Sequence, residues 1–286
     1  MASVKRISIY LALSIALMLI LFSVSVLSLR WIDPPFTSFT LREDWASLDA
    51  ERYNLRDWWI PAESIQDHLK WAVIASEDQL FRSHRGFDTE SIRQVMEESA
   101  EGGRVRGAST ITQQLAKNLY LWPKQSYIRK GIEAFITIQI ELFLPKERIL
   151  EIYLNVVEFG PGVFGAGKAI HDYFGIEPDQ LTPRLSAQMA VVLPNPKRLS
   201  LAAPGPYATE RRGWVLKQMT QLSGIQFIPH LVPENVEADS LHLPEFAPDS
   251  TDVEELTLPE IEIDTLLWLS EPDTPIHRAD TSGTNQ

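Results

Sequence analysis

"GASTITQQLAKNLYLWPKQSYIRKGIE", residues 107–133, contains two helix starts separated by an aromatic run. Thr110 and Gln113 have the spacing of a capping box, in which each side chain binds the other residue's backbone N–H. Apolar residues then recur at helical spacing, at Ile111, Leu115 and Leu119. The pattern predicts a helix that begins at Ser109 or Thr110 and buries one apolar side.

The other side of this predicted helix is polar and carries Gln113, Gln114, Lys117 and Asn118. The N-terminus of a helix offers free N–H groups and a positive dipole end, both of which suit an anion. Lys117 adds a point charge that suits phosphate. A polar helix face can also be one that only contacts water, and the residues alone leave both interpretations open.

The second helix start, RKGIE, places Arg129 and Glu133 one turn apart, with Lys130 beside them. An ordinary ion pair at this spacing stabilises a helix by roughly 0.3 kcal/mol. The alternative is a functional group made of two cations and a carboxylate. The aromatic run before it contains Lys124 and suits either the lipid headgroup boundary or a packed loop.

Upstream of this stretch, EDQLFRSHRG occupies residues 77–86. On a continuous helix Glu77, Phe81 and His84 share one face. Partial burial beside an aromatic ring raises the pKa of a carboxyl group, as a general base requires. The competing interpretation is an ordinary helix end, at which Glu77 is solvated and His84 caps.

The rest of the body also reads as helical, and strand patterns are scarce. Helical periodicity begins near Pro61 and returns at 128–144, 146–155, 163–173, 182–193 and 207–223. GPGVFG (160–165) satisfies G-x-G-x-x-G, but it follows a helical pattern rather than a strand. We therefore interpret it as a tight helix-to-helix turn and not as a dinucleotide site. The six histidines are scattered and predict no metal cluster.

The N-terminal region predicts one membrane anchor. Residues 7–29 are 23 uncharged residues between Arg6 and Arg30, and a helix needs roughly 20 to cross a hydrocarbon core. A cleaved signal peptide is the alternative, but no convincing small-x-small cleavage site follows. The basic residues before the span predict that the N-terminus (1–6) lies in the cytoplasm and that the span lies in the inner membrane. The body is then expected to face outward, in the periplasm.

Charge divides the remaining chain into a body and a tail. The net charge is -12, yet residues 233–286 hold fourteen acidic residues and only Arg278 as a base. The tail is therefore expected to be disordered, and the acidity says nothing about the ligand of the body. We expect a linker and membrane-proximal segment over 30–60 and a folded domain over 61–232. The absence of cysteine excludes a disulfide framework.

Four motifs in the same order resemble those of the peptidoglycan glycosyltransferases: EDQLFRSHRG, GASTITQQLAKN, RKGIE and KERILEIYLN. The resemblance covers about residues 60–222, and the single anchor is similar to that of the monofunctional biosynthetic transglycosylases. It implies a mainly α, lysozyme-like fold with a head lobe and a membrane-associated jaw lobe, preceded by one transmembrane helix. The S-x-x-K and K-T-G patterns of related transpeptidases do not occur in the sequence, so no cross-linking activity is expected.

The resemblance also implies a reaction, in which lipid II is polymerised into glycan with inversion and release of undecaprenyl pyrophosphate. Glu77 matches the catalytic base, and Glu133 matches a second carboxylate that organises the diphosphate site. The matching cations are Lys117, Arg129 and Lys130. Supporting motif positions are Asp78, Phe81, His84, Ser109, Thr110, Gln113, Gln114 and Asn118.

The implied partners are lipid II, the growing lipid-linked glycan, membrane lipid and proteins of cell division or elongation, with no nucleic acid. No cofactor is expected, although a divalent cation such as Mg²⁺ at the pyrophosphate stays open. The family inhibitor moenomycin is expected to block the reaction.

Two positions depart from the family pattern: Gln125, where relatives commonly carry a basic residue, and Leu185, where they carry a glutamate. Two other functions stay open. One is a glycan-cleaving lytic enzyme, which would need an acid for its sugar leaving group. The other is a non-catalytic, membrane-anchored scaffold of the cell wall machinery.

Overall fold

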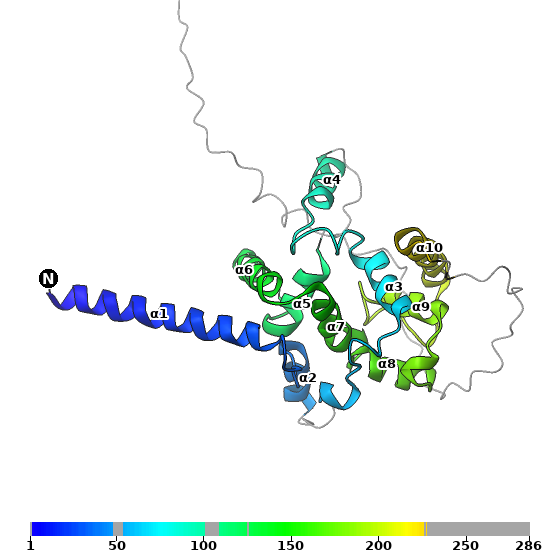
Figure 1. Ribbon diagram of the computed structural model, residues 1–286, viewed down its shortest axis with the longest axis horizontal. Helices are drawn as coiled ribbons and strands as arrows, with labels where there is room; N and C mark the ends of the chain where they lie inside the picture. The colour runs from blue at the N-terminus through cyan, green and yellow to red at the C-terminus, as the bar shows by residue number, and fades with distance from the viewer. Residues whose placement is uncertain (1, 48–53, 101–108, 125, 226, 228–286) are drawn as a thin grey trace, which may run out of the picture. The chain divides into compact units, whose positions relative to one another are not determined.

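The computed structural model describes residues 2–47, 54–100, 109–124, 126–225 and 227 (Figure 1). The helices are α1 (Ala2–Ser28), α2 (Ser38–Ser47), α3 (Asp67–Glu77), α4 (Thr89–Ala100), α5 (Ile111–Tyr120), α6 (Tyr127–Phe143), α7 (Lys146–Val156), α8 (Ala166–Phe174), α9 (Pro183–Val192) and α10 (Pro206–Ser223). Two short 3₁₀ helices are η2 (Leu55–Trp58) and η3 (Pro178–Gln180). The prediction of a mainly α protein is confirmed.

The chain divides into two compact units. One comprises residues 1–89 and 108–249, and the other comprises 90–107 and 250–286. In the second unit the structure describes residues 90–100, which belong to α4. The acidic tail predicted at 233–286 lies outside the described residues. All the site residues discussed below belong to the first unit.

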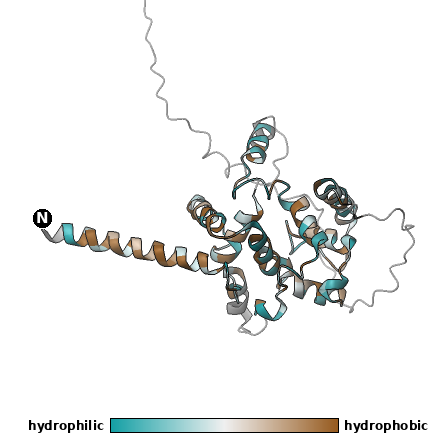
Figure 2. Ribbon diagram, in the orientation of Figure 1, coloured by the Kyte–Doolittle hydropathy of each residue, from teal (hydrophilic) through white to brown (hydrophobic). Residues whose placement is uncertain are grey.

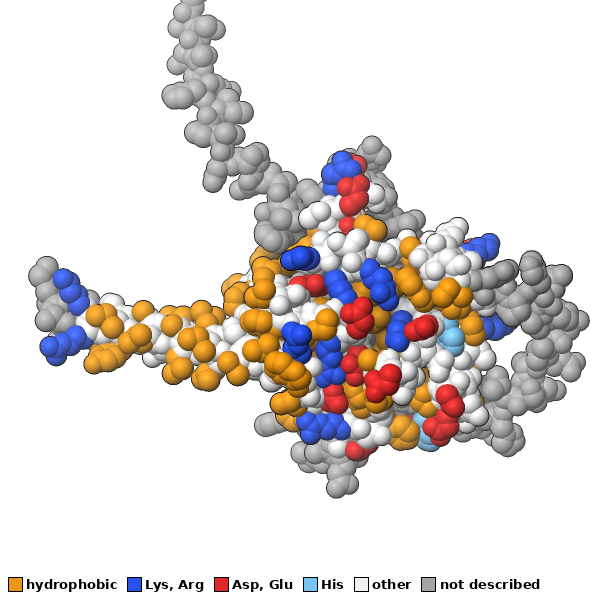
Figure 3. All heavy atoms as spheres, viewed as in Figure 1, with side chains coloured by type: hydrophobic (Ala, Val, Ile, Leu, Met, Phe, Trp, Pro, Cys, Tyr) orange, Lys and Arg blue, Asp and Glu red, His pale blue; other side chains and the backbone are white. Residues whose placement is uncertain are grey.

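Helix α1 is the candidate membrane span. Residues Lys5–Ser28 form a continuous helix with a mean hydropathy of 2.5. Figure 2 shows mostly hydrophobic residues along it, and Figure 3 shows apolar side chains over much of the face in view. Its last turn differs, because Val26 is fully buried and Leu29, just beyond the helix, is nearly so. The anchor therefore packs against the folded body at its C-terminal end.

Helices α5, α6 and α7, which are consecutive in the sequence, pack together. The predicted apolar stripe of α5 is confirmed, since Ile111 and Leu115 are fully buried and Leu119 nearly so. The capping box is confirmed as well: Thr110 accepts from the N–H of Gln113, and the Gln113 side chain accepts from the N–H of Thr110. This cap fixes where α5 begins.

A second group of helices, α3, α9 and α10, packs mutually. The N-cap of α9 is Thr182, whose hydroxyl accepts from the N–H of Leu185. Val215 and Met219 of α10 are fully buried in the common hydrophobic core. Glu77 is the last residue of α3, so this group positions the predicted catalytic base.

The segment GPGVFG is a correction to the predicted helix-to-helix turn. It lies in an antiparallel hairpin of β1 (Glu158–Gly160) and β2 (Val163–Phe164), which connects α7 to α8. Gly162 and Gly165 both have positive φ, and a Cβ on Gly165 would lie 2.8 Å from the carbonyl oxygen of Asn155. These glycines therefore serve the turn and a close backbone approach.

The segment before α3 is tied to α7 by one side chain. Asn155 is 1% exposed; its amide oxygen accepts from the N–H of Ile60 at 2.8 Å, and its amide nitrogen donates to the carbonyl of Ile60 at 2.9 Å. The same nitrogen donates to the carbonyl of Glu151. This asparagine ends the KERILEIYLN motif, so the motif has a structural role in placing the chain that leads into α3.

Candidate active site

Helix α3 ends at Glu77, which corrects the prediction of a helix that continues through Phe81 and His84. The helix ends at Glu77, with Asp78 as its C-cap, and residues 79–86 form turns. Phe81 and His84 therefore do not share a helical face with Glu77. Phe81 is buried, with its ring under the ammonium group of Lys146 at 4.4 Å.

Asp78 turns away from the helix because its carboxylate has two partners elsewhere. Oδ1 lies 2.8 Å from Nε2 of His84, and Oδ2 accepts from the backbone N–H of Ile111 at 3.0 Å. Nδ1 of His84 accepts from the N–H of Gly86, so the proton of a neutral imidazole lies on Nε2 and points at Asp78. Asp78 thus attaches the end of α3 to the start of α5.

The start of α5 is closed by the protein itself, which corrects the prediction of a free anion site there. The N–H groups of Thr110, Ile111 and Gln113 bind Gln113, Asp78 and Thr110, respectively. The Thr110 hydroxyl also donates to the carbonyl of Gly86 at 2.7 Å. Thr110 and Gln113 are therefore positioning residues, and any anion must be bound further along α5.

Gln114 connects the carboxylate of Glu77 to α7. Its amide nitrogen donates to Oε2 of Glu77 at 2.9 Å, and its amide oxygen accepts from the hydroxyl of Tyr153 at 2.9 Å. Tyr153 is fully buried, and burial raises the pKa of its hydroxyl well above the usual value, so it stays a donor. This chain of bonds holds Glu77 in one orientation.

Burial raises the pKa of Glu77 above its ordinary value, and the bonds from Gln114 and Ser76 oppose this effect. The nearby charges of Arg211 and Lys117 oppose it as well. A carboxylate with a raised pKa is a stronger base once it is ionised. Glu77 therefore has the electrostatic character that the sequence predicted, although the cause is burial between helices and not the ring of Phe81.

Lys117 is half-buried, three residues along α5 from Gln114. Burial lowers the pKa of its ammonium group. The charges of Glu133 and Glu77 raise that pKa, whereas Arg129 and Lys130 lower it further. Lys117 is thus electrostatically coupled to the base on one side and to the cluster at the start of α6 on the other.

The start of α6 holds that cluster. Oε2 of Glu133 lies 3.1 Å from Nη1 of Arg129, and Oε1 lies 2.7 Å from Nζ of Lys130. Glu133 is 3% exposed and Arg129 is 7% exposed, so the ordinary solvent-exposed ion pair is excluded. Nε of Arg129 is buried and has no hydrogen-bond partner among the described residues. That N–H is therefore an unsatisfied donor inside the cluster.

The structure does not bring every predicted residue to this site. Gln113 and Asn118 are buried inside the fold, so the alternative of a merely solvated face is wrong for both. The carbonyl of Asn118 accepts from the hydroxyl of Ser38, which joins α5 to α2. Ser109 is exposed before the cap.

Two residues at the site were missed by the sequence prediction. Arg211 of α10 acts on Glu77 from 134 positions downstream, and no local pattern marks it. Tyr153 lies inside the KERILEIYLN motif, where the helical spacing from Ile149 and Leu150 could have marked it as buried. A buried tyrosine hydroxyl needs a hydrogen-bond partner, so its burial would also have indicated that a polar residue lies beside it.

Of the two departures, Leu185 is half-buried on α9 and packs against the hydrophobic core, and Gln125 lies outside the described residues. An apolar side chain thus supports α9 at the position where the resemblance implied a glutamate.

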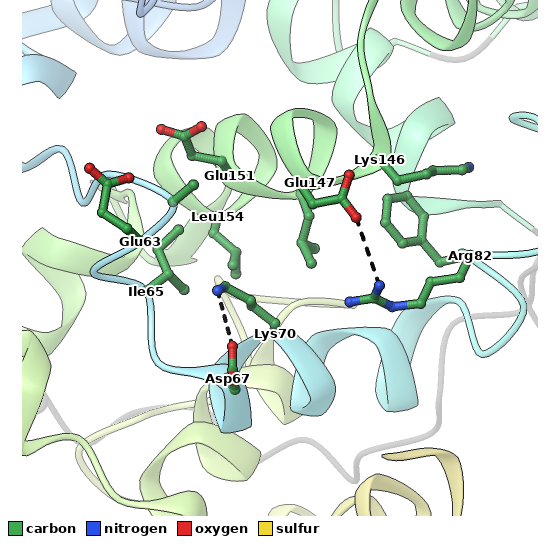
Figure 4. Close-up of a pocket in the computed structure, with 12 residues that line it drawn as sticks. Glu63, Ile65, Asp67, Lys70, Arg82, Lys146, Glu147, Glu151 and Leu154 are labelled. Atoms are coloured by element: carbon green, nitrogen blue, oxygen red, sulfur yellow. Dashed lines mark hydrogen bonds and ion pairs between the residues drawn. The ribbon is translucent and has the colours of Figure 1, made fainter.

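A separate pocket of about 330 Å³ lies between α3 and α7 (Figure 4). Its floor is apolar and includes Ile65 and Leu154, and ion pairs at its rim join Lys70 to Asp67 and Arg82 to Glu147. It includes Phe81 but none of the charged residues of the candidate site. The pocket is therefore separate from the candidate site formed by Glu77, Lys117 and the α6 cluster.

Comparisons with known proteins show the family to which the chain belongs. A family model described as Transglycosylase matches residues 46–220. The "Biosynthetic peptidoglycan transglycosylase" of Ectopseudomonas mendocina (strain ymp) is 46% identical over 215 residues, which are 74% of this chain and 88% of that protein. Proteins of the same description from Pseudomonas entomophila (strain L48) and Pseudomonas putida (strain W619) are each 47% identical, over 209 and 211 residues. These segments cover 72% and 73% of this chain, and 88% and 89% of the two relatives.

Proposed function

The chain belongs to the transglycosylase family and is a peptidoglycan glycosyltransferase with a lysozyme-like domain, and from this premise we propose how its residues divide the reaction. The substrate class is the lipid-linked disaccharide, lipid II, together with the growing glycan. The proposed reaction is attack of an acceptor hydroxyl on C1 of the donor, with inversion and release of undecaprenyl pyrophosphate.

Glu77 is the proposed general base. Its carboxylate accepts the proton of the acceptor 4-hydroxyl while the hydroxyl oxygen forms the new bond to C1. Gln114, held by Tyr153, keeps that carboxylate in position through one 2.9 Å hydrogen bond to Oε2. The other oxygen, Oε1, has only a longer contact of 3.3 Å, from the Ser76 hydroxyl. It is the better placed of the two to face the acceptor.

The cations have the complementary role at the leaving group. A diphosphate leaves as an anion, so positive charge and N–H donors stabilise the transition state without a proton being transferred to it. Lys117 supplies a charge, and Arg129 supplies both a charge and the unpaired Nε. Glu133 positions Arg129 and Lys130 and does not contact the reacting atoms.

One observation supports this division most directly. The charges of Glu77, Arg129, Lys130 and Glu133 all act on the pKa of Lys117, so this lysine lies within electrostatic reach of both the proposed base and the cluster. A glycan-cleaving enzyme has to protonate a sugar oxygen and gains nothing from three cations beside its acid. The cation cluster therefore favours synthesis over lysis.

The exposed apolar surface of the protein suits a substrate that is linked to a lipid. Helix α6 carries exposed apolar side chains at helical spacing, at Ile128, Ile132, Phe135, Ile138 and Leu142. Together with α1 they form a surface suited to contact with the bilayer. We propose a single-pass anchor with its N-terminus in the cytoplasm, which places the catalytic unit outside, at the inner membrane. Proteins of division or elongation are proposed partners.

Labelled lipid II and the purified full-length protein in detergent provide the test. We expect glycan polymer in the absence of moenomycin and none in its presence. Glu77→Gln should lower kcat by about 100- to 10,000-fold, the usual contribution of a general base, whereas Glu63→Gln, at an exposed carboxylate, should not.

Three other results would contradict the proposal. Shortened preformed glycan without new polymer would indicate a lytic enzyme. Full complementation in cells by Glu77→Gln would indicate a scaffold. We propose that the protein side chains alone hold the diphosphate, so a chelator should leave the rate unchanged; a rate restored only by added Mg²⁺ would assign a divalent cation to the site.

A further inference from the structure

One side chain of α7 holds the segment that leaves the candidate membrane anchor. Nε of Arg148 donates to the carbonyl of Leu29 at 2.8 Å, and Nη2 donates to Oδ1 of Asp33 at 2.7 Å. Leu29 directly follows α1, and Asp33 lies four residues later. The third nitrogen, Nη1, lies 2.8 Å from Oε2 of Glu151, which is also on α7. The guanidinium of Arg148 therefore connects the exit of the anchor to the folded body.

This joint is largely buried, unlike an ordinary surface ion pair. The side chain of Arg148 is 12% exposed and that of Glu151 is 10% exposed. Cζ of Arg148 lies 5.6 Å from the ring centroid of Trp59, whose indole N–H donates to Oε1 of Glu151 at 3.2 Å. A planar guanidinium with three bound nitrogens is held in one orientation, which a lysine cannot reproduce. The joint is therefore rigid and specific to arginine.

Further hydrogen bonds hold the exit segment (residues 29–35). Nε and Nη2 of Arg56 donate to the carbonyl of Asp33 at 3.1 and 2.8 Å. The N–H of Leu55 donates to the carbonyl of Pro35 at 3.1 Å. Both donors belong to η2, which packs against α7. The exit segment is thus attached to the body and does not act as a flexible tether.

Helix α7 also carries a residue of the candidate site. Tyr153 lies five residues beyond Arg148, a rise of about 7.5 Å along the helix. Its hydroxyl donates to Gln114, which in turn donates to Glu77. One helix therefore connects the exit of the anchor with the proposed base.

We propose that Arg148 is a positioning residue that sets the height and tilt of the catalytic unit above the bilayer. The inference rests on the proposed function and adds to it the reason why the anchor is held rigidly. A lipid-linked donor has its diphosphate at the membrane surface, so the cations of α6 must lie at the same height. A displacement of about 1 Å that misaligns reacting groups can lower a rate by about 100-fold. A loose joint would let the unit take orientations in which the diphosphate lies out of reach.

The distance to the bilayer tests the joint directly and without catalysis. The chain has no cysteine, so Lys217→Cys, at an exposed position of α10, gives one site for a fluorescent label. Energy transfer to a dye on the headgroups of phosphatidylethanolamine–phosphatidylglycerol vesicles then measures the height of the label. Arg148→Lys and Asp33→Ala should each broaden the distribution of distances. An unchanged distribution in both variants would overturn the proposal.

Polymerisation rates give the second readout. In vesicles, Arg148→Lys and Asp33→Ala should lower the rate roughly tenfold, because a loose joint misplaces the unit. In detergent micelles no flat bilayer fixes the height of the donor, so both variants should keep the wild-type rate. Asp172→Ala, which breaks an ion pair with Lys168 within α8, is the matched control and should lower neither rate.

The two media separate a role in positioning from a role in stability. Equal losses of rate in vesicles and in micelles would show that Arg148 stabilises α7 in general, and would overturn the positioning role. Wild-type rates of both variants in vesicles would overturn it as well. If the wild-type protein forms polymer in neither medium, the proposed function itself fails, whereas the distances from the bilayer still test the joint.

Discussion

At the level of single residues, burial acts in opposite senses on the base and on the first cation. It raises the pKa of Glu77 and lowers that of Lys117, so both groups titrate closer to neutrality than exposed side chains do. Glu77 must be ionised and Lys117 protonated for the proposed reaction. The two shifts therefore narrow the pH range in which both are in the required state.

The first prediction concerns this pH range. The profile of kcat/KM should be bell-shaped, with its acidic limb above the ordinary glutamate value of 4.5 and its alkaline limb below the ordinary lysine value of 10.5. Lys117→Arg should move the alkaline limb upward, since a guanidinium keeps its proton. The measurement is the initial rate of polymerisation against pH, and an alkaline limb unmoved in Lys117→Arg would contradict the assignment.

The second prediction concerns Glu133. Glu133→Gln removes the anion between two cations, of which Arg129 is buried, and uncompensated buried charge is costly. We expect a loss of about 3 kcal/mol in the free energy of unfolding, measured by denaturant titration, together with weaker donor binding. Glu90→Gln, which disrupts the exposed pair with Arg93, should change stability little. Equal losses in the two variants would argue against a buried cluster.

The sequence predicted the principal charged residues but not all of their neighbours. Short motifs can be recognised in a sequence without knowledge of the fold, and such motifs contain Glu77, Lys117, Arg129 and Glu133. Arg211 reaches Glu77 only because α3 and α10 pack together, and sequence spacing contains no information about that packing.

At the level of elements, capping chemistry was predictable and helix termination was only partly so. The start of α5 follows from Thr110 and Gln113, three positions apart. The end of α3 at Glu77 does not follow from local sequence, because the partner that draws Asp78 away is the N–H of Ile111, 33 positions later. The hairpin β1–β2 was missed for a similar reason, since its strands have three and two residues and show no alternation.

The third prediction concerns Gly86, which joins these elements. Its φ is +87°, and a Cβ there would lie 2.7 Å from Cγ2 of Thr137. Gly86→Ala should destabilise the protein by about 2 kcal/mol through backbone strain, and should lower kcat by displacing the carbonyl that holds Thr110.

Gly213→Ala is the matched control for Gly86. It lies within α10 and has open space around the added methyl group, so it should be neutral or slightly stabilising. Thermal unfolding and polymerisation rates measure both variants. A neutral Gly86→Ala would show that the junction is not required.

At the level of the whole molecule, the composition and periodicity of the sequence predicted the N-terminal apolar helix and the mainly α fold. A long uncharged stretch gives α1, and helical periodicity with few strand patterns gives a mainly α body. The packing of α1 on α6 was not predictable from the sequence. Phe22 contacts Tyr120 and Phe135, and both of these residues lie more than 90 positions further along the chain. Contacts of that kind depend on three-dimensional fit.

The fourth prediction concerns the acidic tail. Removing residues 233–286 deletes a net charge of -13 and leaves a body close to neutral. The residues of the proposed reaction all lie before residue 212, so the shortened protein should polymerise lipid II at the wild-type rate and unfold at the same temperature. Rates should be compared at low and at high salt. A rate that changes only at low salt would assign the tail an electrostatic influence on the site.

The bonds from Asp78 to Ile111 and from Gly86 to Thr110 clamp both ends of the intervening stretch, residues 87–109. A chain pinned at both ends can change in length between them with only a slowly growing entropic penalty. The position of Glu77 relative to α5 should therefore tolerate a change in the length of this interval, such as an inserted affinity tag, so long as helix α4 (Thr89–Ala100) stays intact.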